Sequence, residues 1–179
     1  LQYADAPWIG NLSQWTVEAW FRVTDSLSSK EATAVVCTVY DDSNAGNHPS
    51  TGQVNFSIGT GGGTYQNSFR VSFYNGVDSG WHECDAFTPT QGQWVHVVGT
   101  FDGAVMKQYV NGTISGSPVA VVGGSSANGG NIRIARRWDS ALQSQQLFPG
   151  DIGVVKIYNR PLSSTEVADR YSSGTKSYS

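Results

Sequence analysis

The sequence predicts an all-β fold, a two-sheet antiparallel jelly-roll sandwich with one short helical turn near the C-terminus. Three observations predict it. Apolar and polar residues alternate in short segments, the pairs Asp102-Gly103 and Asn111-Gly112 follow two of these segments, and a helical pattern occurs only at 163–171. Alternation with a period of two is typical of strands with one buried face. Asp-Gly and Asn-Gly favour tight hairpin turns.

The clearest strand is expected at 15–23. Val17, Ala19 and Phe21 share one face of it, and Glu18 and Trp20 share the other. Similar alternation or short apolar runs predict strands at 34–40, 54–58, 69–73, 95–101, 105–111, 118–122, 131–135 and 152–158. Stretches rich in Gly, Ser and Asn predict loops at 41–53, 59–68, 75–92, 123–130 and 136–149. Many short strands at this spacing favour a sandwich of about a dozen strands over a parallel sheet.

Residues 148–166 combine a glycine turn, a buried strand and the start of a helix. Ser163 and Glu166 have the spacing of a capping box, in which each side chain binds a backbone amide of the other residue. Val167 and Tyr171 follow at the i, i+4 spacing of one helix face. This segment therefore predicts a strand that ends in a tight turn and a capped helix.

Composition limits the classes of function. The 179 residues fit a single domain, 1–179, and the chain begins at Leu1 without Met, so we expect part of a larger protein or assembly. Only 14% of the residues are charged, which suits an extracellular, cell-surface or virion-surface β-protein. The net charge of −3 gives no reason to expect a nucleic-acid partner. No apolar run approaches the roughly 20 residues that a membrane span requires.

Three segments, in order, resemble laminin G-like and pentraxin-like domains of the concanavalin A-like lectin/glucanase superfamily. They are 15–21, 93–112 with its Asp-Gly and Asn-Gly turns, and 150–166. With 132–135 in the position of the strand before the last long loop, the resemblance covers most of residues 12–171. It implies a jelly-roll sandwich.

The residues that carry this resemblance have structural explanations. Trp20 and Trp94 can supply large buried area at a sheet edge or between the sheets. His96, in an alternating strand, is expected to be a structural histidine. Trp15 and Tyr158 are expected in the core.

Catalysis is not expected. Glycoside hydrolases need two carboxylates that face one another across the bond to be cleaved. The nearest candidate is Glu83-Cys84-Asp85, which lacks a third carboxylate nearby, and Glu18 is the only carboxylate on its strand face. No nucleophile motif or phosphate-binding glycine motif occurs. We therefore expect a protein that is not an enzyme.

The resemblance implies a calcium site on loops at one rim of the sandwich. Its ligands here would be Asp41, Asp42 and Asp139, because hard cations prefer several oxygen ligands. The chain departs from the family pattern at Gly153-Val154, where many laminin G-like domains carry an acidic pair. This departure weakens the inherited Ca²⁺ site.

A glycan site would combine aromatic platforms with polar hydrogen-bonding groups. Candidate ligand-binding residues are aromatic or polar residues of the predicted loops: Trp138, Trp81, Tyr65, Asn44, Arg137 and His82. Trp138 is the strongest, since it has no evident core role between Arg137 and Asp139. The alternative is that Trp138 folds back over the sandwich edge.

Two classes of function remain open. The first is a non-catalytic recognition module that binds glycan through rim loops 41–53, 75–92 and 136–149. The second is a structural protein-contact or decoration domain of a capsid, fibre or adhesin, for which an oligomer or a larger assembly would be expected. Cys37 and Cys84 could form one disulfide or remain two buried thiols.

Overall fold

The computed structural model describes residues 4–7, 12–25, 35–40, 55–60, 68–75, 80–122, 131–139 and 144–178. These residues form fourteen strands and one helix. The first strands are β1 (Ala4–Pro7), β2 (Trp15–Val23), β3 (Val35–Tyr40), β4 (Asn55–Thr60), β5 (Phe69–Asn75), β6 (Gly80–Glu83) and β7 (Trp94–Phe101). The others are β8 (Val105–Val110), β9 (Thr113–Ile114), β10 (Val119–Ala120), β11 (Asn131–Ile134), β12 (Arg136–Asp139), β13 (Ser144–Leu147) and β14 (Gly150–Tyr158), followed by helix α1 (Ser164–Tyr178).

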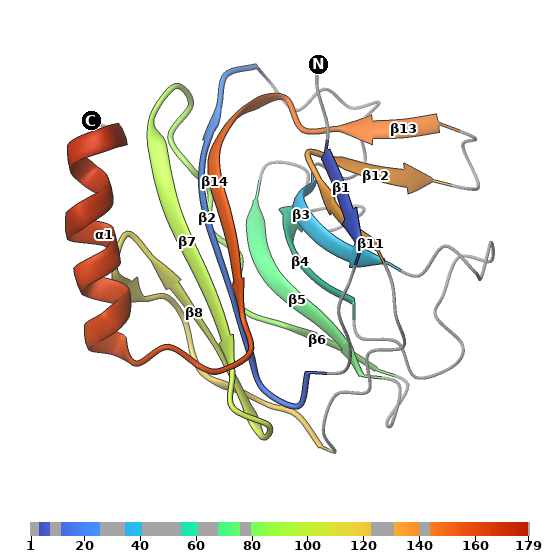
Figure 1. The fold of residues 1–179 in the computed structure, drawn as a ribbon, viewed down its shortest axis with the longest axis vertical. Helices are drawn as coiled ribbons and strands as arrows, with labels where there is room; N and C mark the ends of the chain where they lie inside the picture. The colour runs from blue at the N-terminus through green and yellow to red at the C-terminus, as the bar shows by residue number, and fades with distance from the viewer. Residues whose placement is uncertain are drawn as a thin grey trace.

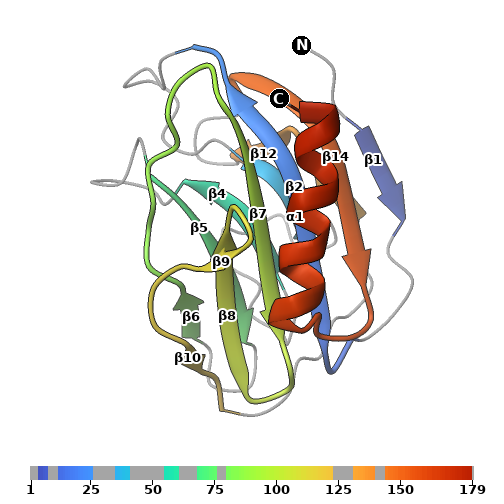
Figure 2. The same cartoon turned by 90° about the vertical axis from the view of Figure 1, so that its left-hand side faces the viewer.

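Two antiparallel sheets face each other (Figure 1). The first sheet has six strands in the order β1-β11-β3-β4-β5-β6. The second sheet has the order β10-β8-β7-β2-β14, with β9 paired to β8, and β12 and β13 form a separate hairpin. The helix α1 lies on the outer face of the second sheet (Figure 2). The predicted jelly-roll sandwich with a C-terminal helix is confirmed.

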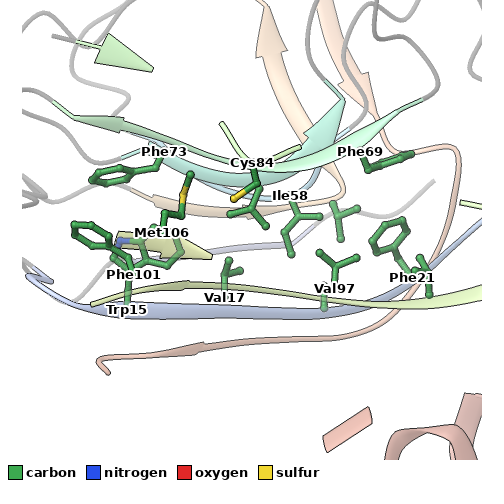
Figure 3. Packing of buried hydrophobic residues seen from close by; sticks show 14 of the residues in the cluster. Trp15, Val17, Phe21, Ile58, Phe69, Phe73, Cys84, Val97, Phe101 and Met106 are labelled. Atoms are coloured by element: carbon green, nitrogen blue, oxygen red, sulfur yellow. The ribbon is translucent and has the colours of Figure 1, made fainter. Parts of the chain in front are cut away.

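The hydrophobic core fills the space between the sheets. Phe69 and Phe73 of the first sheet point toward Trp15, Phe21 and Phe101 of the second sheet (Figure 3). All five side chains are fully buried, and their rings pack in tilted contacts with centroids 5.1 to 5.9 Å apart. The alternation that predicted these strands therefore placed their core faces correctly.

The strands β2 and β7 are buried on both faces, and not only on the core face as the alternation predicted. The cause is α1, which covers their outer face. A second apolar cluster lies in this outer layer and consists of Val98, Tyr109, Leu162 and Val167. Trp20 also belongs to the outer layer, and so the prediction that it lies at an edge or between the sheets was wrong.

The helix α1 runs seven residues beyond its predicted end at residue 171. Its start was predicted correctly: Ser163 N donates to Glu166 Oε2 at 2.8 Å, and Glu166 N donates to Ser163 Oγ at 3.2 Å. The last two turns lack an apolar pattern and contain Gly174, which disfavours a helix. Packing explains why these two turns are helical. The backbone at Gly174 lies so close to the Trp20 ring that a Cβ there would be only 2.5 Å from it.

The two predicted hairpin turns are confirmed. Asp102 Oδ1 accepts hydrogen bonds from the amides of Ala104 and Val105, and Gly103 has a φ of +98°. Asn111 and Gly112 both have positive φ, 50° and 79°, between β8 and β9. Such values are typical of a type I′ turn and explain the Asn-Gly pair.

Several elements were not predicted. The strand β6 lies inside the predicted loop 75–92, and β12 and β13 pair as a hairpin inside the predicted loop 136–149. Their sequences, such as Gly80–Glu83 and Ser144–Leu147, lack the apolar alternation used to find strands. Backbone pairing, rather than side-chain burial, defines these short strands.

The strand β14 carries a register shift between Ile152 and Val154. At the residue between them, Gly153, a Cβ would meet the Tyr178 ring, which would have to shift to admit it. The space beside Gly153 is therefore occupied by the end of α1. No helix in the described part of the chain is long and apolar enough to cross a membrane.

Cys84 is a free thiol in the core, and so the disulfide alternative does not apply to it. Burial, with a smaller contribution from the charge of Asp85, raises the pKa of Cys84 to about 12. The thiol therefore stays protonated and packs as a small apolar group. The side chain of Cys37 lies outside the described residues.

Candidate functional site

Tyr65, Asn44, Asp41 and Asp42 lie outside the described residues. The calcium site and these parts of the glycan site therefore stay predictions. Among the residues that the structure describes, no three His, Cys, Asp or Glu side chains group in a way that could hold a metal ion.

Arg137, Trp138 and Asp139 lie in the hairpin strand β12, whose Trp138 pairs with Gln145 of β13. Only the backbone of this hairpin is described. The strand β12 follows β11, one of the two strands at the β1 end of the first sheet.

Trp81 and His82 lie on β6, at the opposite edge of the first sheet from β1. They point to opposite faces: Trp81 is 43% exposed, and the His82 ring lies 6.3 Å from the buried Phe73 ring. His82 therefore borders the core, while Trp81 belongs to the outer face. Four strand spacings separate β6 from β11, about 19 Å. The structure therefore does not bring β6 close to the strand that leads into the Trp138 hairpin.

The outer face at this edge carries a polar and aromatic group, which we call the β5–β6 surface: Arg70, Ser72, Trp81 and Glu83. Phe69, Val71 and Phe73 of β5 face the core, so the alternate residues Arg70 and Ser72 face outward. Ser72 pairs with Glu83 in the strand register, which places Glu83 and Trp81 on the same outer face.

A charged pair holds the β5–β6 surface together. Arg70 Nη1 donates to Glu83 Oε2 at 2.5 Å. The Arg70 side chain is 8% exposed and that of Glu83 is 41% exposed. Trp81 and Glu83 are two residues apart on one strand, which corresponds to about 7 Å. An exposed indole thus lies on the same strand face as a carboxylate that a buried guanidinium orients.

The carboxylates of Glu83 and Asp85, the nearest catalytic candidate in the sequence, already have hydrogen-bond partners. Glu83 pairs with Arg70, and Asp85 Oδ2 accepts a hydrogen bond from Ser117 N at 3.2 Å. The Asp85 carbonyl accepts from Gln108 Nε2, and Gln108 Oε1 accepts from Val71 N at 2.7 Å. Gln108 is 1% exposed, so it links the two sheets inside the core. The contacts of Glu83 and Asp85 therefore indicate a structural role for both residues.

A buried polar network under α1 was not predicted. Glu18 is 2% exposed, and its carboxylate is not isolated as the sequence suggested. Four side chains surround it: His96 Nε2 at 3.3 Å, Tyr158 Oη at 2.9 Å, Arg170 Nη1 at 3.4 Å and Lys156 Nζ at 3.9 Å. We call this set the Glu18 network. It joins β2, β7 and β14 to α1, and it makes His96 structural, as predicted. Tyr158 lies in it half-buried, outside the core where it was expected.

Two opposing effects set the pKa of Glu18. Burial disfavours the charged carboxylate, while hydrogen bonds from His96 and Tyr158 and the charge of Lys156 favour it, and the pKa is lowered on balance. Burial and the bond to Glu18 raise the pKa of Tyr158 to about 12. Around neutral pH the network therefore contains a carboxylate and a neutral phenol.

The Glu18 network predicts an acid-dependent loss of stability. A lowered folded-state pKa stabilises the protein above the ordinary value of 4.5, and this stabilisation is lost as the pH falls through the folded-state value. Glu18→Gln resembles the protonated side chain. We expect the difference in melting temperature between the wild type and Glu18→Gln to be largest at pH 7 and to shrink below about pH 4.5. Thermal melts at pH 7 and pH 3 measure it; a constant difference would contradict the assignment.

An aromatic stack completes the attachment of α1. The Trp20 ring stacks on the rings of His96, Tyr178 and Tyr171, with centroid distances of 4.9, 4.9 and 5.7 Å. Next to it, Arg22 lies over the Trp94 ring and pairs with Asp151. The outer layer is thus a polar and aromatic interface, in contrast to the apolar core.

The fold defines a jelly-roll sandwich of the concanavalin A-like class. A family model described as the concanavalin A-like lectin/glucanases superfamily, Laminin_G_3, matches residues 2–168. The chain therefore belongs to this laminin G-like family, which confirms the resemblance drawn from the sequence. A comparison with curated proteins gives no significant match.

Solved structures support the same fold. A heptameric SAP-like pentraxin from Limulus polyphemus aligns with a TM-score of 0.62 and 16% identity, over 93% of this chain and 73% of the pentraxin chain. Domain 4 of the extracellular arabinanase AbnA from Geobacillus stearothermophilus, in complex with arabinotriose, aligns with a TM-score of 0.64 and 15% identity, over 91% and 68%. The receptor-binding domain of botulinum neurotoxin D gives 0.63 and 10%, over 93% of this chain but only 38% of the toxin chain.

Proposed function

We propose that this domain is a non-catalytic recognition module that binds glycan through the β5–β6 surface, outside the cell or on a particle surface. The observation that carries the proposal is the exposed Trp81 indole beside the Glu83 carboxylate that Arg70 orients. The apolar C–H face of a sugar ring packs on an indole, and its hydroxyl groups bind carboxylates.

The chemistry of the β5–β6 surface favours a neutral glycan. The charges of Arg70 and Glu83 cancel, so neither an anionic nor a cationic ligand is strongly attracted. The half-exposed Glu83 keeps free oxygen lone pairs for hydroxyl donors. Trp81 contributes contact area with little loss of side-chain freedom on binding.

The solved structures with this fold are consistent with recognition. The arabinanase domain was captured with arabinotriose, and a botulinum neurotoxin binding domain was captured with a ligand named SialylT. The arabinanase is an extracellular enzyme. These are properties of distant proteins, and a shared fold does not transfer a function by itself. They make carbohydrate the first ligand class to test.

A glycan array followed by titration of the best hit tests the proposal. Trp81→Ala should weaken binding of that glycan about 30-fold, the effect of losing an aromatic hot spot of about 2 kcal/mol. Trp138→Ala is the matched control, since it removes the other candidate indole. Loss of binding in Trp138→Ala alone would move the site to the β12–β13 hairpin. Repeating the array with a chelator tests the calcium prediction for Asp41, Asp42 and Asp139.

A protein-contact role is the other outcome of this experiment. One botulinum neurotoxin binding domain of this fold was captured with rat synaptotagmin II. An array without specific hits would favour this second class and reject glycan binding at the β5–β6 surface.

A further inference from the structure

A pocket of about 530 Å³ lies between α1 and the edge strand β14, on the outer face of the second sheet. This volume falls within the range of about 300–1,000 Å³ that is typical of small-molecule sites. Its floor is formed by Glu18 and Trp20 of β2, one wall by Val154 and Lys156 of β14, and the other wall by α1. Figure 2 shows α1 in front of the second sheet, in which β14 is the neighbour of β2. The pocket lies on the opposite sheet from the β5–β6 surface.

The helix wall presents a row of available polar groups. Asp169, Ser173 and Ser177 line the pocket at intervals of four residues, so they share one helix face and follow each other about 6 Å apart. Within the described part of the chain, these three side chains make no hydrogen bond or ion pair to another residue. They offer one carboxylate and two hydroxyls to a ligand.

The other charged groups of the pocket are already paired. Glu166 accepts two hydrogen bonds from Arg160, and Arg170 binds Tyr158 and Glu18. Three carboxylates and two cationic side chains line the pocket, so their charges nearly cancel. An anionic ligand would meet the carboxylates, and a cationic ligand would meet the cationic side chains, so either would be repelled in part. A neutral ligand rich in hydroxyl groups would meet donors and acceptors without that cost.

Apolar surface completes the pocket. The Tyr178 ring, which stacks on the buried Trp20, and the half-buried Val154 side chain also line the pocket. Such a mixture of ring and hydroxyl-binding groups suits a sugar, which has apolar C–H faces and polar edges. A buried, already ionised carboxylate at the floor makes the site pre-formed, because its partners hold it in place.

We propose that the α1–β14 pocket is a second binding site, for a neutral monosaccharide unit, with Asp169, Ser173 and Ser177 of α1 as its hydrogen-bonding groups. It does not depend on the β5–β6 surface, because the two sites lie on different sheets. A domain with both sites would bridge two sugar units and gain avidity from multivalent contact.

The test is two-dimensional amide NMR of the whole chain titrated separately with D-glucose, D-galactose and L-arabinose. At least one sugar should shift the amide signals of residues 154–156 and 169–178 in a saturable manner. Ser173→Phe, which fills the pocket, should weaken that binding at least about tenfold. Ser172→Phe is the matched control: it makes the same change at the neighbouring exposed position that does not line the pocket.

The outcomes separate the two proposed sites. Trp81→Ala should leave the shifts in α1 unchanged, even if it abolishes glycan binding at the β5–β6 surface. Asp169→Asn keeps the shape of the helix and should also weaken sugar binding, which covers the case that Ser173→Phe does not fold. The pocket proposal is overturned if none of the three sugars shifts α1 signals, or if the shifts persist in both pocket variants.

Discussion

Replacing Glu18 with Ala should lower the free energy of unfolding by about 3–5 kcal/mol, as expected for removal of one partner from a buried charged network. Glu18 is 2% exposed and accepts hydrogen bonds from three strands or helices at once. Without it, Arg170 loses its buried carboxylate and Tyr158 loses its acceptor. The fully buried His96 would then keep neither ring nitrogen bonded among the described residues, because its Nδ1 has no partner there.

Asp151→Ala is the control for this prediction. Asp151 also pairs with an arginine on the second sheet, Arg22, but their side chains are 49% and 37% exposed. An exposed pair contributes only about 0–1 kcal/mol. Urea denaturation of both variants measures the difference. Equal, small losses for Glu18→Ala and Asp151→Ala would show that the Glu18 network does not support the fold.

Replacing Trp20 with Ala should cost about 3–5 kcal/mol, the usual effect of truncating a buried aromatic side chain. Trp20 is 3% exposed, and its ring contacts His96, Tyr171 and Tyr178. Its loss removes the surface on which the second half of α1 packs. Because that half has no apolar pattern of its own, we expect it to unfold locally.

Two readouts check the Trp20 prediction. The free energy of unfolding should fall, and hydrogen exchange of the amides at residues 172–178 should become faster than in the wild type. Trp81→Ala serves as the control, since it truncates the same residue type at a 43% exposed position. If exchange in 172–178 does not change in Trp20→Ala, something other than the aromatic stack holds α1.

The core of the fold was predictable because its signals are local. The strand Trp15–Val23 shows its alternation within nine residues, and the capping box of Ser163 and Glu166 is complete within four. The Asn111-Gly112 turn needs only the two residues that adopt positive φ. Each of these features depends on neighbours along the chain.

The outer layer was not predictable because its partners are distant in the sequence. Glu18 resembles one polar residue of an exposed strand face, and its partners His96, Tyr158 and Arg170 lie 78, 140 and 152 residues away. Only the strand order β7-β2-β14 and the placement of α1 bring them together. The extension of α1 beyond residue 171 has the same origin, since Gly174 and Tyr178 are ordered by contact with Trp20.

The candidate site contains one residue that could be predicted from its sequence neighbours and two that depend on distant partners. Trp81 could be identified as an unusual aromatic residue in a polar segment. Its neighbours Glu83 and Arg70 required the pairing of β5 with β6, because a strand inside a Gly- and Ser-rich segment gives no alternation signal. The α1–β14 pocket could not be found from the sequence, because Ser173 and Ser177 lie beyond the predicted end of the helix at residue 171.

The affinity of the best array glycan for the wild type, Trp81→Ala and Trp138→Ala tests the central claim most directly. If the β5–β6 surface recognises glycan, the affinity falls about 30-fold in Trp81→Ala and stays within about twofold of the wild type in Trp138→Ala. An affinity that does not change in Trp81→Ala, with the variant folded as judged by its melting temperature, would contradict glycan recognition at this surface.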